Sequence, residues 1–289
     1  MKIVNINSGL GNQMFQYAFY LSLKNMNKNQ KVKVDITWFD NEKFHNGFEL
    51  SKVFGVSPDF ATYPEVKALS HVGYSFLSRV KRRLCLRKDE IVEPKILQFK
   101  YSPSLFGQTD VDNFYRGYWQ SYKYFDSVEH EVLREFSFPI FSDRNNLEME
   151  EFLKENIGRT VSIHVRLGDY LKDKRLSGLC SLEYYTEAIS KVRERVEDPI
   201  FIVFSDDIDW CKSNLDSIGA KFVDWNISKN SFRDMQLMSL CSNNIIANSS
   251  FSWWGAFLNK NESKLVIAPK VWMRDVNTDD LIPDSWVRL

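Results

Sequence analysis

The sequence has little of what marks several common classes of protein. Its four cysteines lie far apart without a Cys-x-x-Cys spacing, which argues against both a zinc site and a disulfide framework. No stretch approaches the roughly 18 consecutive apolar residues of a membrane-spanning helix, and no apolar signal-peptide core opens the chain. Basic and acidic residues balance at 38 each, so no net field attracts nucleic acid. We therefore expect a cytoplasmic protein without a nucleic-acid partner.

The second half of the sequence contains a regular alternation of strand and helix patterns. Short β-branched runs alternate there with apolar residues at helical spacing, which predicts an α/β fold with a doubly wound parallel sheet. Such sheets bind ligands at the carboxyl ends of their strands. The change of pattern places a domain boundary near residue 150, giving domains at 1–150 and 151–289. Strands are expected at 2–6, 31–36, 161–165, 200–205, 221–225, 245–247 and 265–268, and helices at 12–27, 128–136, 147–156, 182–196, 208–215, 232–241 and 251–258.

A turn with two glycines, Gly9 and Gly11, joins the first expected strand to the first helix. One interpretation is a dinucleotide-binding turn, because Asp35 follows Gly11 at about the distance of the acid in that fingerprint. Met14, however, stands where the fingerprint needs a third small residue. The other interpretation is that the glycines let the backbone approach a ligand closely, with the amide group of Asn12 beside them.

The strand expected at 161–165 leads directly into Arg166. An arginine is unfavourable at the end of a buried strand unless it meets an anion, and its planar guanidinium suits a phosphate. Asp169 follows closely and could hold the guanidinium, so the alternative is a structural Arg166–Asp169 ion pair. His164 alternates to the same side of the strand as Arg166, although a lone histidine is more often a satisfied core residue.

The strand expected at 200–205 ends at Ser205 and leads into acidic residues. Asp206 comes first, and Asp207 and Asp209 then form an Asp-x-Asp motif. In one class of transferase such a motif holds Mn²⁺ or Mg²⁺ against a sugar nucleotide. Two acidic residues at the start of a helix are equally explained by the helix dipole. We favour the helix start and expect no metal site.

A small polar turn of Asn248, Ser249 and Ser250 precedes an apolar helical segment that begins near Phe251. The two serines stand where an N-cap belongs. The free amides and the positive end of the helix dipole make such a turn a site for an anion, and the alternative is an ordinary capped helix. If neighbouring strands present this turn and Arg166, the two together could neutralise a diphosphate without metal.

A basic run extends from Arg79 to Lys88, within a stretch at 37–110 that is otherwise difficult to interpret. Such a run could touch an anionic membrane surface or a phosphorylated lipid that carries an acceptor, which would make the protein peripheral to the membrane. The alternative is a solvated helix face, which is the commoner origin of basic runs.

Three blocks of this sequence resemble the bacterial-type α-1,2-fucosyltransferases of glycosyltransferase family 11. They are GLGNQMFQYA at 9–18, HVRLGDY at 164–170 and NSSFSWWGA at 248–256, with GYWQS at 117–121 as a shorter match. The resemblance implies a GT-B architecture, with an N-terminal acceptor-side domain, a C-terminal domain that binds the GDP-sugar, and a cleft between two Rossmann-like domains. It further implies transfer of L-fucose from GDP-β-L-fucose to the 2-hydroxyl of a terminal galactose, with inversion and without a required metal or cofactor.

The resemblance also implies roles for individual residues. Arg166 maps to an arginine that grips the donor diphosphate, while Leu167 replaces the second arginine of the family's block. We expect Arg166, Asn12 and Asp169 to act in catalysis, Asn12 lying near the acceptor, but the sequence identifies no general base. The residues expected at the donor are Gly9, Gly11, His164, Arg166, Ser205, Asp206, Asp234, Asn248, Ser249, Ser250 and Phe251.

Three alternatives remain from the sequence. The enzyme could use another GDP-sugar or form another linkage. A nicotinamide-dependent oxidoreductase would use the Gly9–Gly11 turn for a pyrophosphate, and a carbohydrate-binding module would explain the tryptophans but not the β/α second half. The sugar beneath the galactose, and whether the acceptor oligosaccharide is lipid-linked, are not specified by the sequence.

Overall fold

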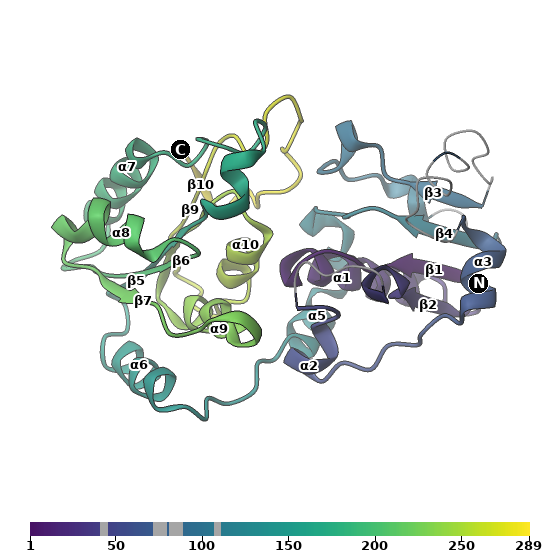
Figure 1. Ribbon diagram of the computed structural model, residues 1–289, viewed down its shortest axis with the longest axis horizontal. Helices are drawn as coiled ribbons and strands as arrows, with labels where there is room; N and C mark the ends of the chain where they lie inside the picture. Colours follow the sequence, from purple (N-terminus) through teal and green to yellow (C-terminus); the bar gives the residue numbers. More distant parts are fainter. Residues whose placement is uncertain (41–45, 72–79, 81–88, 107–110) are drawn as a thin grey trace. The chain divides into compact units, whose positions relative to one another are not determined.

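The computed structural model describes residues 1–40, 46–71, 80, 89–106 and 111–289, the side chains of Ile96 and Asp169 excepted. The chain divides into two compact units. The first comprises Met1–Ser137 with Asp279–Leu281, and the second comprises Phe138–Thr278 with Ile282–Leu289. Each unit is an α/β structure built on one parallel sheet (Figure 1). The predicted α/β fold class with two Rossmann-like units is therefore confirmed. The basic run from Arg79 to Lys88 lies outside the described residues, Val80 excepted.

The sheet of the first unit has the strand order β2-β1-β4-β3, and all of its strand pairs are parallel. Helix α1 packs against β1 and β2 and buries Met14, Phe15 and Phe19 at helical spacing. Met14 is thus a core residue. The strands are β1 (Lys2–Asn5), β2 (Val32–Asp35), β3 (Glu90–Val92) and β4 (Asn113–Arg116), and the helices are α1 (Leu10–Met26), α2 (Leu50–Phe54), α3 (Tyr63–Leu69) and α5 (Glu129–Glu135).

The sheet of the second unit has the order β10-β9-β8-β5-β6-β7 and is also entirely parallel. Its central strand, β5, pairs Val165 with Ser205 of β6 and Ile163 with Ile245 of β8. The strands are β5 (Thr160–Val165), β6 (Ile200–Ser205), β7 (Lys221–Val223), β8 (Asn243–Ile245), β9 (Val266–Ala268) and β10 (Val287–Arg288). The helices are α6 (Arg144–Glu155), α7 (Leu182–Arg193), α8 (Ile208–Leu215), α9 (Phe232–Leu240) and α10 (Ser250–Phe257).

Helices cover both faces of this second sheet. Val161, Ile163 and Val165 of β5 point to one face, where they join a buried apolar cluster with residues of α7 and α8. Helices α9 and α10 lie on the opposite side of the sheet (Figure 1). Alternate residues of β5, among them His164, therefore point to the α9–α10 side. The doubly wound sheet predicted for the second half is confirmed.

The strand order creates a topological switch point in the second unit. The chain proceeds from β5 to β6 and β7 on one side, and then crosses to β8 on the other side of β5. In open parallel sheets, ligands bind at the carboxyl ends of the strands that flank such a reversal. The switch point between β5 and β8 lies next to Arg166 and the Asn248–Ser250 turn. The first unit has a similar reversal between β1 and β4.

The division between the units differs from the predicted boundary at residue 150. That residue lies inside α6, which belongs to the second unit because Asn146 holds the loop after β7: its Nδ2 donates to Asn226 (2.7 Å), and Trp225 Nε1 donates to its Oδ1 (3.0 Å). Near the C-terminus the chain returns to the first unit, where Ser121 Oγ donates to the carbonyl of Asp280 (2.7 Å).

In the described part of the chain, no helix has the length and apolar character needed to cross a membrane.

Candidate active site

Arg166 emerges from the carboxyl end of β5 with its side chain about one-third exposed (32%). Its Nη1 lies 3.3 Å from Oδ2 of Asp206, and its guanidinium lies 5.4 Å from the centre of the Tyr170 ring. Asp206 follows β6, the strand paired with β5, so the sheet register brings the two side chains together. The expected partner, Asp169, has its side chain outside the described residues, and that pairing stays a prediction.

Asp206 is itself fixed by the loop that follows Arg166. Its Oδ1 accepts a hydrogen bond from the amide of Leu167 (3.0 Å). A Cβ on Gly168 would collide with Oδ2 of Asp206, so any larger residue there would push the carboxylate away from Arg166. Leu167 packs against the apolar cluster shared with α7 and α8. Leu167, at the position where the resemblance implies a second arginine, is therefore a core contact, and Arg166 is the cation beside Asp206.

His164 is buried beside Arg166, with only 5% of its surface exposed. Its ring lies 5.8 Å from that of Phe251, and its Nδ1 is buried without a hydrogen-bond partner among the described residues. Burial, reinforced by the charge of Arg166, lowers the pKa of His164 to about 3. The imidazole is therefore neutral at physiological pH, and its Nδ1 is available to a ligand as a hydrogen-bonding atom rather than as a charge.

Helix α10 begins at the carboxyl end of β8, the strand next to β5. Ser249 is its N-cap, and its Oγ accepts from the amide of Phe251 (3.3 Å). Trp253 and Trp254 anchor the helix with no exposed surface. Because a helix N-terminus presents amides and a positive dipole end, the start of α10 can bind an anion beside Arg166. Of the two serines expected at this turn, Ser249 is confirmed as the cap and Ser250 opens the helix.

Asn248 makes hydrogen bonds that stabilise the turn before α10. Its Nδ2 donates to the carbonyl of Trp272 (3.1 Å), and its own carbonyl accepts from the Tyr170 hydroxyl (3.2 Å). Tyr184 similarly donates to the carbonyl of Ile246 (2.7 Å), and Tyr185 to that of His164 (3.0 Å). These tyrosines hold the ends of β5 and β8 together. Sequence reasoning missed them, although Tyr170 stands inside the HVRLGDY block and could have been singled out as its aromatic residue.

The acidic residues after β6 form a helix start, as predicted. Ser205 Oγ accepts from the amide of Asp207 (2.9 Å), and Asp207 caps α8 by accepting from the amide of Trp210 (3.0 Å). Asp209 lies in the first turn of the helix. Among the described residues, no group of three or more His, Cys, Asp or Glu side chains is arranged to hold a metal.

Asp234 lies in the first turn of α9, where Asn226 Nδ2 donates to its Oδ1 (2.8 Å). Burial raises the pKa of Asp234 to about 7. Near neutral pH this carboxyl can thus accept hydrogen bonds when ionised and donate one when protonated, which suits the polar edge of a nucleobase.

The first unit gathers a second polar cluster at the ends of β1 and β4. Asn12 Oδ1 accepts from Gln120 Nε2 (2.5 Å), and Ser8 Oγ lies 3.4 Å from the Tyr118 hydroxyl. Ser8 adopts a left-handed conformation (φ 66°), whereas Gly9 does not (φ −78°). The strained residue of this turn is thus Ser8, and a strained non-glycine backbone is often found at functional sites.

Most of the predicted site residues therefore fall into two groups. Arg166, Asp206, His164, Phe251 and Ser249 lie together around the β5–β8 switch point. The other group belongs to the first unit and comprises Gly9, Gly11 and Asn12, joined there by Tyr118 and Gln120.

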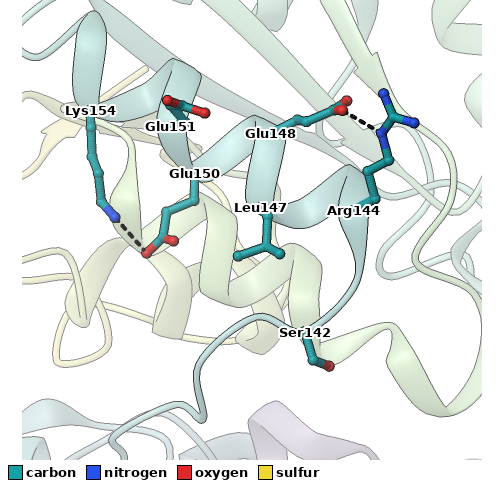
Figure 2. A pocket seen from close by; sticks show the side chains of 7 residues that line it. All are labelled: Ser142, Arg144, Leu147, Glu148, Glu150, Glu151 and Lys154. Atoms are coloured by element: carbon teal, nitrogen blue, oxygen red, sulfur yellow. Dashed lines mark hydrogen bonds and ion pairs between the residues drawn. The ribbon is translucent and has the colours of Figure 1, made fainter.

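A hollow of about 610 Å³ lies along α6 and is not a candidate for the chemistry. Four of its charged side chains form two ion pairs, Arg144 Nε with Glu148 (2.6 Å) and Lys154 Nζ with Glu150 (3.1 Å), as Figure 2 shows. These pairs, four residues apart on one exposed helix face, are what a solvated helix surface presents.

Comparison with known sequences identifies the chain. Residues 95–288 match the sequence model described as Glycosyl transferase family 11. The chain belongs to this family. An α-1,2-colitosyltransferase of Escherichia coli is 33% identical, the alignment covering 99% of this chain and 98% of the relative. The O-antigen biosynthesis glycosyltransferase WbnK of Escherichia coli is 32% identical, over 98% of this chain and 99% of the relative. A galactoside α-(1,2)-fucosyltransferase 2 of Hylobates lar is 25% identical, over 91% of this chain and 70% of the relative.

The family confirms the resemblance inferred from the three sequence blocks. This family 11 member is a glycosyltransferase, which excludes the oxidoreductase and the binding module as its principal activity. The Gly9–Gly11 turn is accordingly not needed as a dinucleotide fingerprint, consistent with Met14 in the core.

Proposed function

We propose that the protein transfers L-fucose from GDP-β-L-fucose to the 2-hydroxyl of a terminal galactose in a glycan, with inversion at the sugar carbon. The observation that carries the linkage is that the colitosyltransferase and the fucosyltransferase 2 relatives, though they name different sugars, both name an α-1,2 bond. The O-antigen relative favours an oligosaccharide of lipopolysaccharide O-antigen as the acceptor.

The donor half of the proposal rests on Arg166 and the start of α10. As the bond to the leaving group breaks, negative charge grows on GDP and positive charge grows on the sugar. A guanidinium and a helix N-terminus at adjacent strand ends stabilise that negative charge more in the transition state than in the ground state. The neutral imidazole of His164 and the carboxyl group of Asp234 offer hydrogen bonds to the nucleoside. The same arrangement would serve other GDP-sugars.

The acceptor half of the proposal rests on the cluster of Asn12, Gln120, Tyr118 and Ser8. These side chains offer donors and acceptors for sugar hydroxyls at the carboxyl edge of the first sheet. Asn12 orients the acceptor, since an amide takes no proton at neutral pH. The proposal assigns no general base.

The colitosyltransferase relative favours one second candidate, transfer of colitose in place of fucose. Colitose is fucose without its 3-hydroxyl, so the two donors differ by one hydrogen-bonding group. A site that hydrogen-bonds that hydroxyl would reject the deoxy sugar strongly, whereas an apolar site would discriminate weakly.

The decisive experiment pairs GDP-fucose, GDP-colitose and GDP-mannose with two panels of glycans, one galactose-terminated and one without terminal galactose, and determines the product linkage by NMR. We expect an α-1,2 product with GDP-fucose and galactosides, and no product with glycans that lack terminal galactose. A strong preference for GDP-colitose would mean that colitose, not fucose, is the sugar transferred. A product linked at another hydroxyl would overturn the proposed α-1,2 linkage.

Metal independence is part of the proposal. Because Asp207 caps α8 and Asp209 lies in its first turn, both have a structural role. We expect full activity in saturating EDTA and a mild effect of Asp209→Asn. Strict loss of activity in EDTA, restored by Mn²⁺, would contradict this part of the proposal.

A further inference from the structure

A cavity of about 280 Å³ lies at the carboxyl ends of β3 and β4, apart from every role assigned above. Aromatic and aliphatic side chains form most of its wall. Glu93 and Lys100 are the charged residues among those that line it, and Lys100 is exposed. Tyr101, Trp119, Tyr124, Leu97 and Leu105 are the apolar and aromatic contributors.

Glu93 is held in this wall by the turn that follows β4. Its Oε2 accepts from the amide of Tyr118 (2.7 Å), and its Oε1 accepts from that of Trp119 (3.2 Å). The turn comes so close that a Cβ on Gly117 would lie 2.5 Å from Cβ of Glu93. Burial raises the pKa of Glu93 to about 8, so near neutral pH its carboxyl group is largely protonated. In that form it has one O–H to donate to a ligand, and its oxygens keep lone pairs that can accept a further hydrogen bond.

The same turn connects the cavity to the polar cluster proposed for the acceptor. Glu93 and Trp119 line the cavity, while Tyr118 and Gln120 of the turn reach Ser8 and Asn12. Trp119 adopts a left-handed conformation (φ 52°), and its ring stacks on Phe19 of α1 with centroids 4.7 Å apart. A rigid turn with strained backbone thus separates two adjoining sites of different character, one polar and one largely aromatic.

The composition of the cavity suits a sugar ring. A pyranose has apolar C–H faces that pack on aromatic rings, and hydroxyls that can accept a hydrogen bond from the Glu93 carboxyl group or donate one to it. The volume is just below the range of about 300–1,000 Å³ typical of small-molecule pockets, which leaves room for a single ring. A nucleotide would also require a phosphate site, and Lys100 is the one cation among the described residues that line the cavity.

We propose that this cavity binds the sugar residue next to the terminal galactose of the acceptor, and so sets which glycans the enzyme accepts. This inference rests on the proposed function, because it assumes a galactose-terminated acceptor at the Asn12 cluster. Glu93 is then a residue of acceptor specificity: its carboxyl group holds the turn and offers its remaining hydrogen-bonding capacity to the second sugar.

Filling the cavity tests the inference by activity. Leu97 is 43% exposed at its rim, so Leu97→Trp should fold and occupy the cavity; Met26→Trp, at an exposed residue (51%) at the end of α1, is the matched control. Transfer is measured onto methyl β-galactoside, lactose, N-acetyllactosamine and galactosyl-β-1,3-N-acetylgalactosamine. In the wild type and the control, we expect at least one disaccharide to exceed the monosaccharide about tenfold in kcat/KM, equivalent to about 1.4 kcal/mol. Leu97→Trp should abolish that advantage. It should leave unchanged both kcat/KM for transfer onto methyl β-galactoside and the KM for GDP-fucose.

A binding measurement tests the cavity without any transfer. Trp119 Nε1 is buried and has no hydrogen-bond partner among the described residues, so its indole signal should be sensitive to an occupant nearby. In ¹⁵N NMR spectra, with the signal assigned through Trp119→Phe, the preferred disaccharide should shift it in the wild type and not in Leu97→Trp.

The two measurements separate failure of the inference from failure of the proposed function. If no donor gives transfer while a disaccharide still shifts the Trp119 signal, the proposed function is wrong and the cavity remains a sugar site. If Leu97→Trp keeps the disaccharide advantage, or if the disaccharides leave the signal where methyl β-galactoside leaves it, the inference is overturned.

Discussion

The pair of Arg166 with Asp206 is open to solvent, its side chains being 32% and 24% exposed. Exposed ion pairs contribute only about 0–1 kcal/mol to stability, so Arg166 is not needed to hold the fold. Its value lies in orientation, because Asp206 and the Tyr170 ring position the guanidinium at the end of β5. A ligand anion would share or replace the contact with Asp206.

Arg166→Ala should therefore remove most activity without unfolding the protein. Loss of a charge-assisted contact to the leaving diphosphate should cost at least about 2–3 kcal/mol in the transition state, or about 30- to 150-fold in kcat/KM. Arg159→Ala, which removes an exposed arginine paired with Asp198 in the same unit, is the control. An Arg166→Ala enzyme with near-native kcat/KM would refute the assignment of Arg166 to the diphosphate. An equal loss of activity in Arg166→Ala and Arg159→Ala would show that the effect is not specific to Arg166.

His164 makes the stability depend on pH in a definite direction. Its pKa is about 3 in the folded protein and about 6.5 when unfolded, so between these values the unfolded chain binds more protons. Stability should therefore fall as the pH drops below 6.5, by about 1 kcal/mol per pH unit. Urea unfolding of the wild type and His164→Asn at pH 5, 6, 7 and 8 checks this. Below pH 6.5 the free energy of unfolding of the wild type should fall more steeply with decreasing pH than that of His164→Asn. Above pH 7 the two proteins should show the same pH dependence of this free energy. The same pH dependence over the whole range would contradict a buried neutral imidazole.

At the scale of the element, the start of α10 combines a structural cap with a candidate phosphate site, and adjacent serines separate the two roles. Ser249 Oγ caps the helix, so Ser249→Ala should lower stability by about 1 kcal/mol. Ser250 is the first helical residue, and Ser250→Ala removes a hydroxyl while leaving the amides and the dipole. We expect Ser250→Ala to weaken GDP binding by about 1–2 kcal/mol. Thermal melting and GDP titration on both variants measure the difference.

The two outcomes at α10 are easily told apart. If the melting temperature of Ser250→Ala falls while its dissociation constant for GDP is unchanged, the turn is a cap only and the phosphate site must be placed elsewhere. Ser250→Leu extends the comparison, because a bulky side chain at this position should obstruct a bound phosphate and weaken GDP far more than alanine does.

At the scale of the whole molecule, the two units should respond to different ligands. Hydrogen–deuterium exchange with saturating GDP should slow exchange at 165–170 and 248–252, because the amides at the ends of β5 and β8 would contact the nucleotide. ADP, with the same diphosphate and another base, is the control and should protect less. Protection by GDP at 9–13 instead would return the Gly9–Gly11 turn to the role of a diphosphate site.

The elements of the second unit were predictable from the sequence because their signals are local. Periodicity identifies β5, β6, β8, α7 and α10 within a few residues, and small polar residues at their ends mark caps and turns. The three family blocks identified the chemistry because they fall at strand and helix ends, where side chains meet ligands. In contrast, β3 was missed, since the stretch at 37–110 has no periodicity that distinguishes a short strand from a loop.

By itself, the sequence determined the α/β class, the family and the arginine and helix terminus at the strand ends, because these depend on patterns within about 20 residues. The tertiary structure decided what those groups contact. Asp206, paired with Arg166 through the register of β5 and β6, and the return of Asp280 to the first unit are contacts between distant segments. The low pKa of His164 and the clamp of Glu93 on the 117–120 turn likewise arise from burial and packing. Local spacing carries no information on these, since burial and register are set by how the whole sheet assembles.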